Sequence, residues 1–528
     1  MEYGDRQPTH GSSIIAFEVI VEQGWELLIK GLKGPLVSSS NQCIVGHQRL
    51  PSKFTMAVTI AFALGLGGCA LIVRLLSNYF LLSKIPGPFT AKFTDLWRYR
   101  SQNSQGHADR LVALHRKYGK LVRIGPKHIS VSDPAAVPIV YSTNPTWPKG
   151  PSYYGAVPVS KNRAVPTIIG MAEAQHTAVR KSVGRAFTTN SLLDYEHSIE
   201  ATGQELIKVL AKETETDIGW WLQLFAIDMI IRITFSDSVG FLEKGEDDGT
   251  LAAVMARFDH WGHWGAMPSV DHLLNKSRIA TILRAAGNSP LAAVSQGFLE
   301  ARKKDADRLS YKDLCSKFLD GQAKYPELVG QDEVLGIIMS TIGAGADTTA
   351  GTLTYTLYFL SKNPHSRTKL LQEIDNNLKA STLSRTPKWT EVNRMPYLDA
   401  VLKESMRLLP VASWGLDRIV PPTGATIAGE FIPGGTIVGC QIDAIHQDEV
   451  VYGRDSTVFR PERWIEASEE QRRQMDRAFL AFSAGKRKCT GVHIAWLEMK
   501  KTLPLLLMNF DVSCRSRKVE IGKEIFGC

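Results

Sequence analysis

One cysteine near the C-terminus, Cys489, stands in a segment that could make its sulfur a metal ligand. Residues 482–491 read FSAGKRKCTG and precede a predicted helix from Val492 to about residue 507. The two glycines allow a tight turn and a close approach to a flat ligand. Arg487, the neighbouring lysines and the N-terminus of the following helix lower the cost of a thiolate, which is a soft ligand suited to iron. For this segment alone, a buried structural cysteine is the more common case.

A second candidate is a helix predicted over residues 332–362, whose centre reads AGADTT at residues 344–349. Gly343 and Gly345 are poor helix formers, so they need a reason. Small residues open space beside the backbone, and a threonine hydroxyl can bond back to a carbonyl and bend the helix. Close helix packing explains the glycines equally well. The charge of Asp347 in mid-segment argues against a second membrane span.

Two pairs of charged side chains have helical spacing. Glu404 and Arg407 lie three residues apart, on one helical face, and can pair. Such a pair often arises by chance and contributes little when it is exposed. His176 and Arg180, two cations four residues apart, also share a face, and surface charge is their ordinary explanation.

These segments together resemble the cytochrome P-450 monooxygenases. Residues 482–491 match the haem-binding loop F-x-x-G-x-R-x-C-x-G of that family at every fixed position. Residues 344–349 are similar to its oxygen-binding helix pattern A-G-x-D-T-T. The E-x-x-R of residues 404–407, followed by P-E-R at residues 461–463, has the order found in the family. The resemblance runs from about Pro86 to the C-terminus.

The resemblance implies a haem cofactor, iron protoporphyrin IX, with Cys489 as the axial thiolate ligand of the iron. It implies that Arg487 meets a haem propionate. His176 and Arg180 look like the H-x-x-x-R variant of a helix that often begins with Trp, and both variants place the pair at the propionates. Arg418 is expected to be a further propionate ligand.

The resemblance also implies a catalytic pair, in which Asp347 and Thr348 deliver protons to oxygen. Family members that only isomerise or rearrange peroxides often lack this pair, so its presence favours oxygen activation. Glu404, Arg407 and Arg463 are expected to form a buried structural network that braces the haem-side core. Removal of one partner would leave an uncompensated buried charge and cost several kcal/mol.

Composition excludes several other classes of protein. The chain has 528 residues, is 44% hydrophobic and carries a formal net charge of +9, which excludes wholesale disorder and collagen. Its seven cysteines include no C-x-x-C pair, so neither a disulfide scaffold nor a structural zinc site is expected. Basic residues form only short clusters at residues 472–477 and 486–488, so we expect no nucleic-acid partner. A solvated face is the ordinary explanation of such clusters, and a docking face for an acidic protein is the sharper one.

An uncharged run near the N-terminus is long enough to cross a bilayer. A buried core helix is the alternative. Met56 would be a natural start for such an anchor, so we expect the polar leader before it to be a gene-model extension. The expected organisation is a leader at residues 1–53, a transmembrane helix at 54–73, a linker with a proline hinge at 74–88 and a haem domain at 89–528.

The rest of the chain predicts a mainly α fold with a small β-sheet region, and the resemblance implies that this is a cytochrome P-450 fold with a single catalytic domain. Helical periodicity dominates from about Ala172 onward. Short strands bounded by turn residues are predicted at residues 121–124, 129–131, 418–420, 426–427 and 436–438.

The expected activity is insertion of one oxygen atom from O2 into an apolar small-molecule substrate, a secondary metabolite. The chain has no credible dinucleotide or flavin fingerprint, so electrons are expected from NADPH through a separate NADPH–cytochrome P-450 reductase.

The apolar pocket walls are expected from residues 151–169, 261–267 and 411–415. The proline hinge and the H-x-x-x-R variant look like fungal members such as the pisatin demethylase group. A single-pass protein of the endoplasmic reticulum with a cytosolic catalytic domain is expected. The alternatives are a thiolate-haem isomerase or dehydratase, or a non-catalytic haem sensor.

Overall fold

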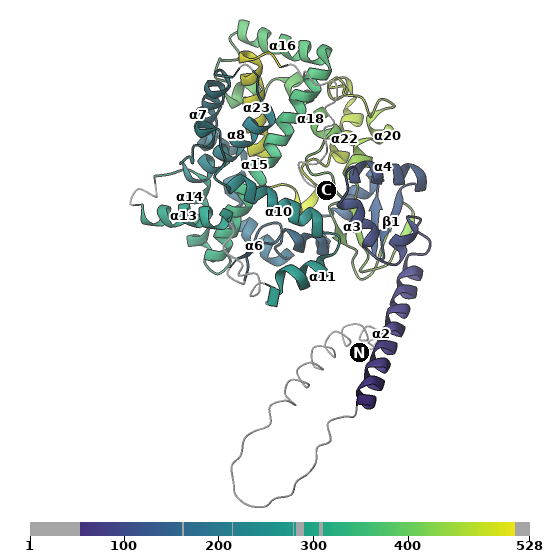
Figure 1. Ribbon diagram of the computed structural model, residues 1–528. Coiled ribbons are helices and arrows are strands. Elements are labelled where there is room, and N and C mark those ends of the chain that lie inside the picture. Colours follow the sequence, from purple (N-terminus) through teal and green to yellow (C-terminus); the bar gives the residue numbers. More distant parts are fainter. Residues whose placement is uncertain are drawn as a thin grey trace, which may run out of the picture. The chain divides into compact units, whose positions relative to one another are not determined.

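The computed structural model describes residues 53–512, apart from residues 161–162, 214, 278, 281–289 and 306–309 (Figure 1). The expected leader therefore lies outside the described residues, except for Lys53. Contacts between residues divide the chain into two units, Met1–Ala70 and Leu71–Cys528.

The described part of the first unit belongs to helix α2 (Lys53–Leu81). Residues Ala57–Leu81 form a 25-residue apolar stretch, none of it buried, which is long enough to cross a membrane. This stretch is a candidate membrane anchor. The helix continues to Leu81, past the expected end of the span at Val73.

The second unit is mainly helical, as predicted. Its sequence alternates long amphipathic or apolar helices with short turns, and the longest helix spans 32 residues. The helices are α3 (Leu96–Gln102), α4 (His107–Tyr118), α5 (Val137–Val140), α6 (Glu173–Val183), α7 (Leu192–Leu210), α8 (Ile218–Phe235), α9 (Phe241–Lys244), α10 (Thr250–Trp264), α11 (Pro268–Asp271), α13 (Pro290–Lys304), α14 (Leu314–Lys324), α15 (Gln331–Lys362), α16 (Pro364–Lys379), α17 (Trp389–Val392), α18 (Pro396–Leu408), α19 (Ile442–His446), α20 (Glu449–Tyr452), α21 (Arg463–Glu466), α22 (Glu469–Ala478) and α23 (Val492–Asn509).

In the described part of the chain, the strands form one small sheet and two hairpins. The sheet has the order β1 (Leu121–Gly125), β2 (His128–Val131), β8 (Ile437–Cys440) and β5 (Arg418–Ile419). β2 pairs parallel with β8, whereas the β1–β2 and β5–β8 pairs are antiparallel. The hairpins are β3 (Val159–Ser160) with β4 (Arg163–Ala164), and β6 (Ala425–Ile427) with β7 (Glu430–Ile432). The predicted strands are present, and β3, β4 and β7 were not foreseen.

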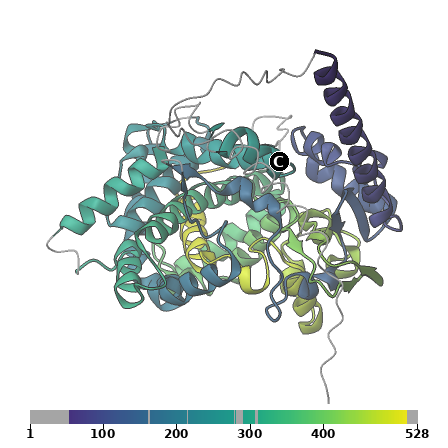
Figure 2. The same ribbon diagram turned by 90° about the horizontal axis from the view of Figure 1, so that it is seen from below.

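Helix α15 crosses the centre of the helical part and packs along α8 (Figures 1 and 2). It begins where Glu333 Oε2 accepts a hydrogen bond from the Gly330 backbone N–H, and it ends before Pro364. The close approach of α8 requires a residue without a side chain at position 345, since a Cβ on Gly345 would lie 2.7 Å from the side chain of Ile230. Close helix packing therefore explains Gly345. Helix α8 passes the same length and apolarity test as α2, but it is mostly buried and is a core helix.

Candidate active site

A cavity of about 340 Å³ lies between α15, α23 and the loop that carries Cys489. Its walls are mostly apolar. Each of the three predicted wall regions contributes to it. Their lining residues are Tyr153, Ile168 and Ile169 from the first region, Trp261 from the second, and Val411, Ala412, Ser413 and Trp414 from the third.

The loop of Cys489 is shaped by a close backbone contact. Gly485 has φ +69°, and a Cβ at this position would lie 1.9 Å from the carbonyl oxygen of Tyr141. Only glycine fits both requirements. The backbone N–H of Cys489 donates to the Phe482 carbonyl at 2.9 Å and closes the loop. The close approach foreseen for the glycines is therefore, at Gly485, an approach to the protein's own backbone.

The sulfur of Cys489 has an open side toward the cavity, which makes it accessible even though protein atoms surround it densely. Burial raises the pKa of the Cys489 thiol, and the Gly491 backbone N–H and the charges of Arg180 and Lys488 offset part of the rise. Arg487, expected to favour the thiolate, pairs with Glu173 instead. A thiolate at this position therefore depends on a bound cation.

Four basic residues also line the otherwise apolar cavity, and we call them the rim cluster. They are Lys149, His176, Arg418 and Arg487. Arg487 donates from Nε to Glu173 Oε2 at 2.9 Å and from Nη2 to the Met171 carbonyl at 2.8 Å. Its Nη1 is buried and has no hydrogen-bond partner among the described residues.

His176 of α6 also lacks a partner for its buried Nδ1 within the described part of the chain. Burial, together with the nearby charges of Arg487 and Lys149, lowers the pKa of His176 to about 3. Among these protein groups the side chain is therefore neutral at neutral pH, whereas the sequence predicts a cation; the place of His176 at a propionate stays a prediction. A neutral imidazole can still donate one hydrogen bond to an anion.

Lys149 was missed by sequence reasoning. The backbone of residues 148–150 pairs with strand β5. The Ile419 N–H donates to the Pro148 carbonyl at 2.8 Å, and the backbone of Lys149 forms an isolated antiparallel β-bridge with that of Arg418. Its Nζ donates to the Ile169 carbonyl at 2.9 Å and lies 4.2 Å from the ring centre of Tyr153. Burial and the charges of Arg487 and Arg418 hold the pKa of Lys149 well below its usual value. No local motif marks this lysine.

The rim cluster fits a ligand that carries carboxylates. Buried donors without partners and cations crowded by like charge both favour an anion at this position. Together with a soft sulfur ligand in the same cavity, this set of donors fits a haem with its two propionates.

Arg180 does not line the cavity. It lies one turn after His176 and donates from Nη1 to the carbonyls of Lys486 (3.2 Å) and Lys488 (3.3 Å). The structure therefore places Arg180 against the backbone of the cysteine loop, where it supports the loop from outside.

Asp347 and Thr348 are adjacent in sequence but differ in surroundings. Thr348 lines the cavity, and its hydroxyl donates to the Ala344 carbonyl at 2.7 Å. Asp347 is fully buried, and neither carboxylate oxygen has a hydrogen-bond partner among the described residues. Burial, with a smaller contribution from the charge of Asp259, raises the pKa of Asp347 to about 7.

Glu404, Arg407 and Arg463 come together in a buried network. Glu404 Oε1 accepts from Arg407 Nη2 at 2.8 Å and from Arg463 Nε at 2.9 Å, while Oε2 accepts from Arg407 Nε at 2.9 Å. Trp464 Nε1 also donates to Oε2 at 2.9 Å, a contact that the motif did not predict. Arg407 Nη1 continues to the His446 carbonyl at 2.6 Å. The network ties α18 to the segment before the cysteine loop.

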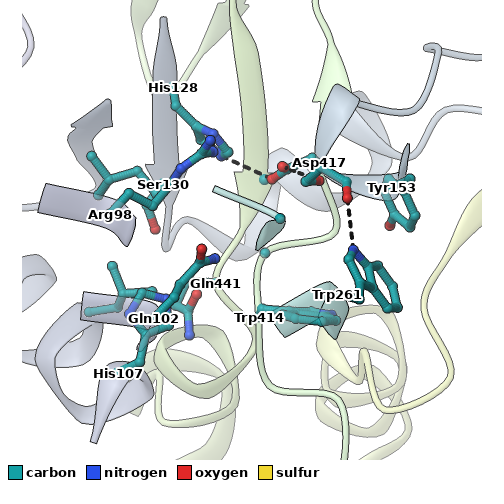
Figure 3. Close-up of a pocket in the computed structure, with 16 residues that line it drawn as sticks. Arg98, Gln102, His107, His128, Ser130, Tyr153, Trp261, Trp414, Asp417 and Gln441 are labelled. Atoms are coloured by element: carbon teal, nitrogen blue, oxygen red, sulfur yellow. Dashed lines mark hydrogen bonds and ion pairs between the residues drawn. The ribbon is translucent and has the colours of Figure 1, made fainter. Parts of the chain in front are cut away.

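A small polar pocket adjoins the cavity (Figure 3). In it, His128 Nε2 lies 2.9 Å from Asp417 Oδ1, and Arg98 contacts the other ring nitrogen of His128. Tyr153, Trp261 and Trp414 line both the polar pocket and the apolar cavity. The ring centres of the two tryptophans lie 4.4 Å apart. These aromatic side chains separate the polar pocket from the apolar cavity.

Comparison with known proteins gives matches over nearly the whole second unit. A family model described as "Cytochrome P450" matches residues 86–524. A cytochrome P450 monooxygenase of Aspergillus terreus is 36% identical over 460 residues, which cover 84% of this chain and 92% of that protein. Cytochrome P450 monooxygenase cicH of Emericella nidulans is 34% identical, with coverages of 84% and 93%. Cytochrome P450 monooxygenase mpaDE of Penicillium brevicompactum is 32% identical, and the match spans only 53% of its length.

Proposed function

The chain belongs to the cytochrome P450 family, and from that membership we propose a haem-thiolate monooxygenase that oxidises an apolar secondary metabolite. The sequence-based assignments of family and enzyme class are confirmed. Enzymes of this family need haem, O2 and a redox partner. The observation that carries the more specific proposal is the cavity that holds the Cys489 sulfur together with the rim cluster.

Cys489 would hold the haem iron, and His176, Arg418, Arg487 and Lys149 would hold the propionates. Bound haem supplies the oxidising power, and a thiolate ligand favours O–O cleavage. Arg487 and His176 support this assignment, because each has a buried nitrogen with no hydrogen-bond partner in the part of the chain that the structure describes. Arg180 would act on the cysteine loop rather than on the cofactor.

Thr348 would act from the α15 side of the cavity, where its hydroxyl is held by the Ala344 carbonyl. Asp347 would serve as a buried acid that is close to half protonated at neutral pH. Supply of protons to the cavity is the role that we propose for this pair, with Thr348 at the wall and Asp347 behind it.

The apolar lining supports an apolar substrate of the terpenoid, polyketide or alkaloid type. Phe187, Ile230, Phe258 and Trp261 present hydrocarbon surface to the cavity, and a substrate gains binding energy by covering it. The acidic and basic side chains of the wall are the rim cluster, Lys488 and Glu498, which leaves most of the space to hydrophobic contacts.

We propose that NADPH–cytochrome P-450 reductase supplies the electrons. Lys488 is exposed, precedes Cys489, and makes no ion pair among the described residues. Arg472 of α22 adds positive charge, whereas Arg473 on the same helix is paired with Glu469 and Glu470. A basic face near the cysteine loop would attract an acidic partner and orient it.

We propose that α2 anchors the enzyme to the endoplasmic reticulum as a single pass, with the catalytic domain in the cytosol. The organisation into leader, anchor, hinge and haem domain is part of the same proposal. The exposed apolar surface of Ala57–Leu81 supports it. Sequencing of the native N-terminus would test whether the leader exists.

Two measurements test the function. The reduced, CO-bound absorption spectrum should show the shifted Soret band of thiolate ligation, and C489S should lose it. NADPH consumption with added reductase should then depend on a substrate and yield an oxygenated product. Turnover of substrate without NADPH would instead indicate an isomerase or dehydratase, and a haem protein that turns over no substrate would indicate a sensor.

A further inference from the structure

The polar pocket of Figure 3 holds a chain of hydrogen-bonded side chains from four separate segments: Arg98 of α3, His128 of β2, Asp417 just before β5, and Ser152. Arginine only donates hydrogen bonds, so His128 accepts from Arg98 through Nδ1 and carries its proton on Nε2. Nε2 therefore donates to Asp417 Oδ1 at 2.9 Å. The Ser152 hydroxyl donates to Asp417 Oδ2 at 2.7 Å. Both oxygens of this carboxylate are thus held by partners far from it in the sequence.

The backbone around Asp417 leaves room for its side chain. A Cβ on Gly150 would lie 2.7 Å from Asp417 Cβ, and a Cβ on Gly439 would lie 3.0 Å from Asp417 Oδ1. Both distances are below the roughly 3.5 Å at which non-bonded atoms pack favourably. A side chain at either glycine would therefore push against the carboxylate, and the two glycines together make the space that it occupies.

The carboxylate of Asp417 is buried and charged. Burial raises its pKa to about 6, and the charge of Arg98, the Ser152 hydroxyl and the charge of Arg418 offset part of the rise. The group is therefore mostly ionised at neutral pH. A buried ion is costly unless it is paired and hydrogen-bonded, and Asp417 meets both conditions through the His128 ring, with Arg98 beyond it, and through Arg418 beside it.

Asp417 lies where two segments of the rim cluster meet. Its backbone carbonyl accepts from the Gly150 N–H at 3.1 Å and from Arg418 Nη1 at 2.9 Å. Lys149 directly precedes Gly150. The carboxylate adds a second link to the same segment through Ser152. The main chain and the side chain of this one residue therefore fasten the segments that carry two of the four rim residues.

We propose that Asp417 is a positioning residue for the cofactor site, whose carboxylate keeps Lys149 and Arg418 directed at the cavity. The inference rests on the proposed function, which assigns these two cations to the haem propionates. Asp417 itself is not among the residues that line the cavity, so it acts through its neighbours. His128 and Arg98 hold the carboxylate in turn, which connects α3 to the cofactor site.

Positioning is tested by hydrogen exchange of backbone amides in the haem-loaded protein. D417A and S152A each break the link from the carboxylate to residues 148–153, so peptides of this segment should exchange about tenfold faster, as expected when a hydrogen bond to a charged group is lost. D228A is the matched control, because it removes another buried carboxylate, one that accepts from the Leu242 N–H at 2.8 Å, and it should leave residues 148–153 unchanged. Wild-type exchange in both D417A and S152A overturns the proposal, and S152A alone decides if D417A does not fold.

Action on the cofactor is tested by transfer of haem to apomyoglobin. D417A should lose haem about tenfold faster than wild type, within the range found when a partner that orients a ligand is removed. Because Asp417 acts through two cations, its effect should shrink in K149M and in R418M backgrounds, whereas the effect of D228A should stay the same. An effect of D417A that is undiminished in both backgrounds overturns the proposal.

The CO spectrum separates this inference from the proposed function. A wild type without the shifted Soret band would contradict the haem-thiolate assignment. Hydrogen exchange would still decide whether Asp417 holds residues 148–153. A normal CO spectrum with unchanged exchange in the variants would leave the proposed function intact and refute the role of Asp417.

Discussion

Arg487 and Glu173 join the cysteine loop to helix α6 through a hydrogen bond of 2.9 Å between Nε and Oε2. The other oxygen of Glu173 lies 2.9 Å from Lys486 Nζ. Burial alone would raise the pKa of Glu173, but the bonds from Lys486 and Arg487 lower it, so the group is ionised. Glu173 thus fixes the Arg487 guanidinium, whose Nη1 has no hydrogen-bond partner within residues 53–512 as described. We regard Glu173 as a positioning residue for the cofactor site.

Replacement of Glu173 should weaken haem retention although this residue is not expected to touch haem. Partners that orient a ligand typically contribute 10- to 100-fold to affinity, so we expect E173Q to lose haem about 10-fold more readily. Transfer of haem to an excess of apomyoglobin measures this rate. K486M is the matched control, because it breaks the other bond of Glu173 and leaves that to Arg487. Equal haem loss in E173Q and wild type would contradict the positioning role.

Lys149 should be a second, independent determinant of haem retention. K149M keeps the length of the side chain but removes the charge that we assign to a propionate, so haem loss should accelerate several-fold. K127M, at an exposed lysine before β2, should have no effect. A blue-shifted or weakened CO spectrum in K149M would add that the haem has moved. Unchanged haem transfer in K149M would show that Lys149 does not help to hold a propionate.

The Glu404 network should dominate the stability of its region. In R407M the Glu404 carboxylate keeps Arg463 and Trp464 but loses its two bonds to Arg407, and the expected cost is about 3–5 kcal/mol of unfolding free energy. Chemical unfolding followed by tryptophan fluorescence measures it. E466Q breaks the exposed Arg460–Glu466 pair of 2.8 Å and should cost less than about 1 kcal/mol. Similar losses in both variants would show that burial of the pair adds nothing.

Motifs with their chemistry in a few consecutive residues were predictable, and contacts made by tertiary pairing were not. The loop at residues 482–491 and the E-x-x-R turn lie where the sequence indicated, because spacing alone fixes them. Neighbouring helix residues point about 100° apart, so the pattern could not say that Thr348 would line the cavity while Asp347 would not. Lys149 reaches the site through the pairing of its loop with β5, which no local pattern encodes.

Asp347 should make stability depend on pH in a defined window. The pKa is about 7 in the folded protein and 3.8 for the free side chain, so the neutral form is favoured by folding. As the pH rises from about 4 to about 7, the unfolded chain releases this proton while the folded chain keeps it. The unfolding free energy should therefore fall, by about 4 kcal/mol at most, and level off above pH 7.

D347N lacks the titrating group and isolates this effect. The stability of wild type minus that of D347N, from denaturant midpoints at several pH values, should decrease across this window. D375N, at an exposed position on α16, should give a flat difference. A flat difference for D347N as well would mean that Asp347 keeps an ordinary carboxylate, and its proposed role as a buried acid would fail with it.

Charge reversal at Lys488 should slow reduction without loss of haem. Lys488 is exposed and next to Cys489. Its charge is the smallest of the influences that lower the pKa of the Cys489 thiol, so K488E should retain the CO spectrum. Repulsion from an acidic reductase surface should slow association, and the defect should shrink as salt screens the charges. Stopped-flow reduction under CO at low and high ionic strength measures both effects. K208E, at an exposed lysine of α7, controls for net charge, and equal reduction rates in K488E and K208E at low salt would place the docking face elsewhere.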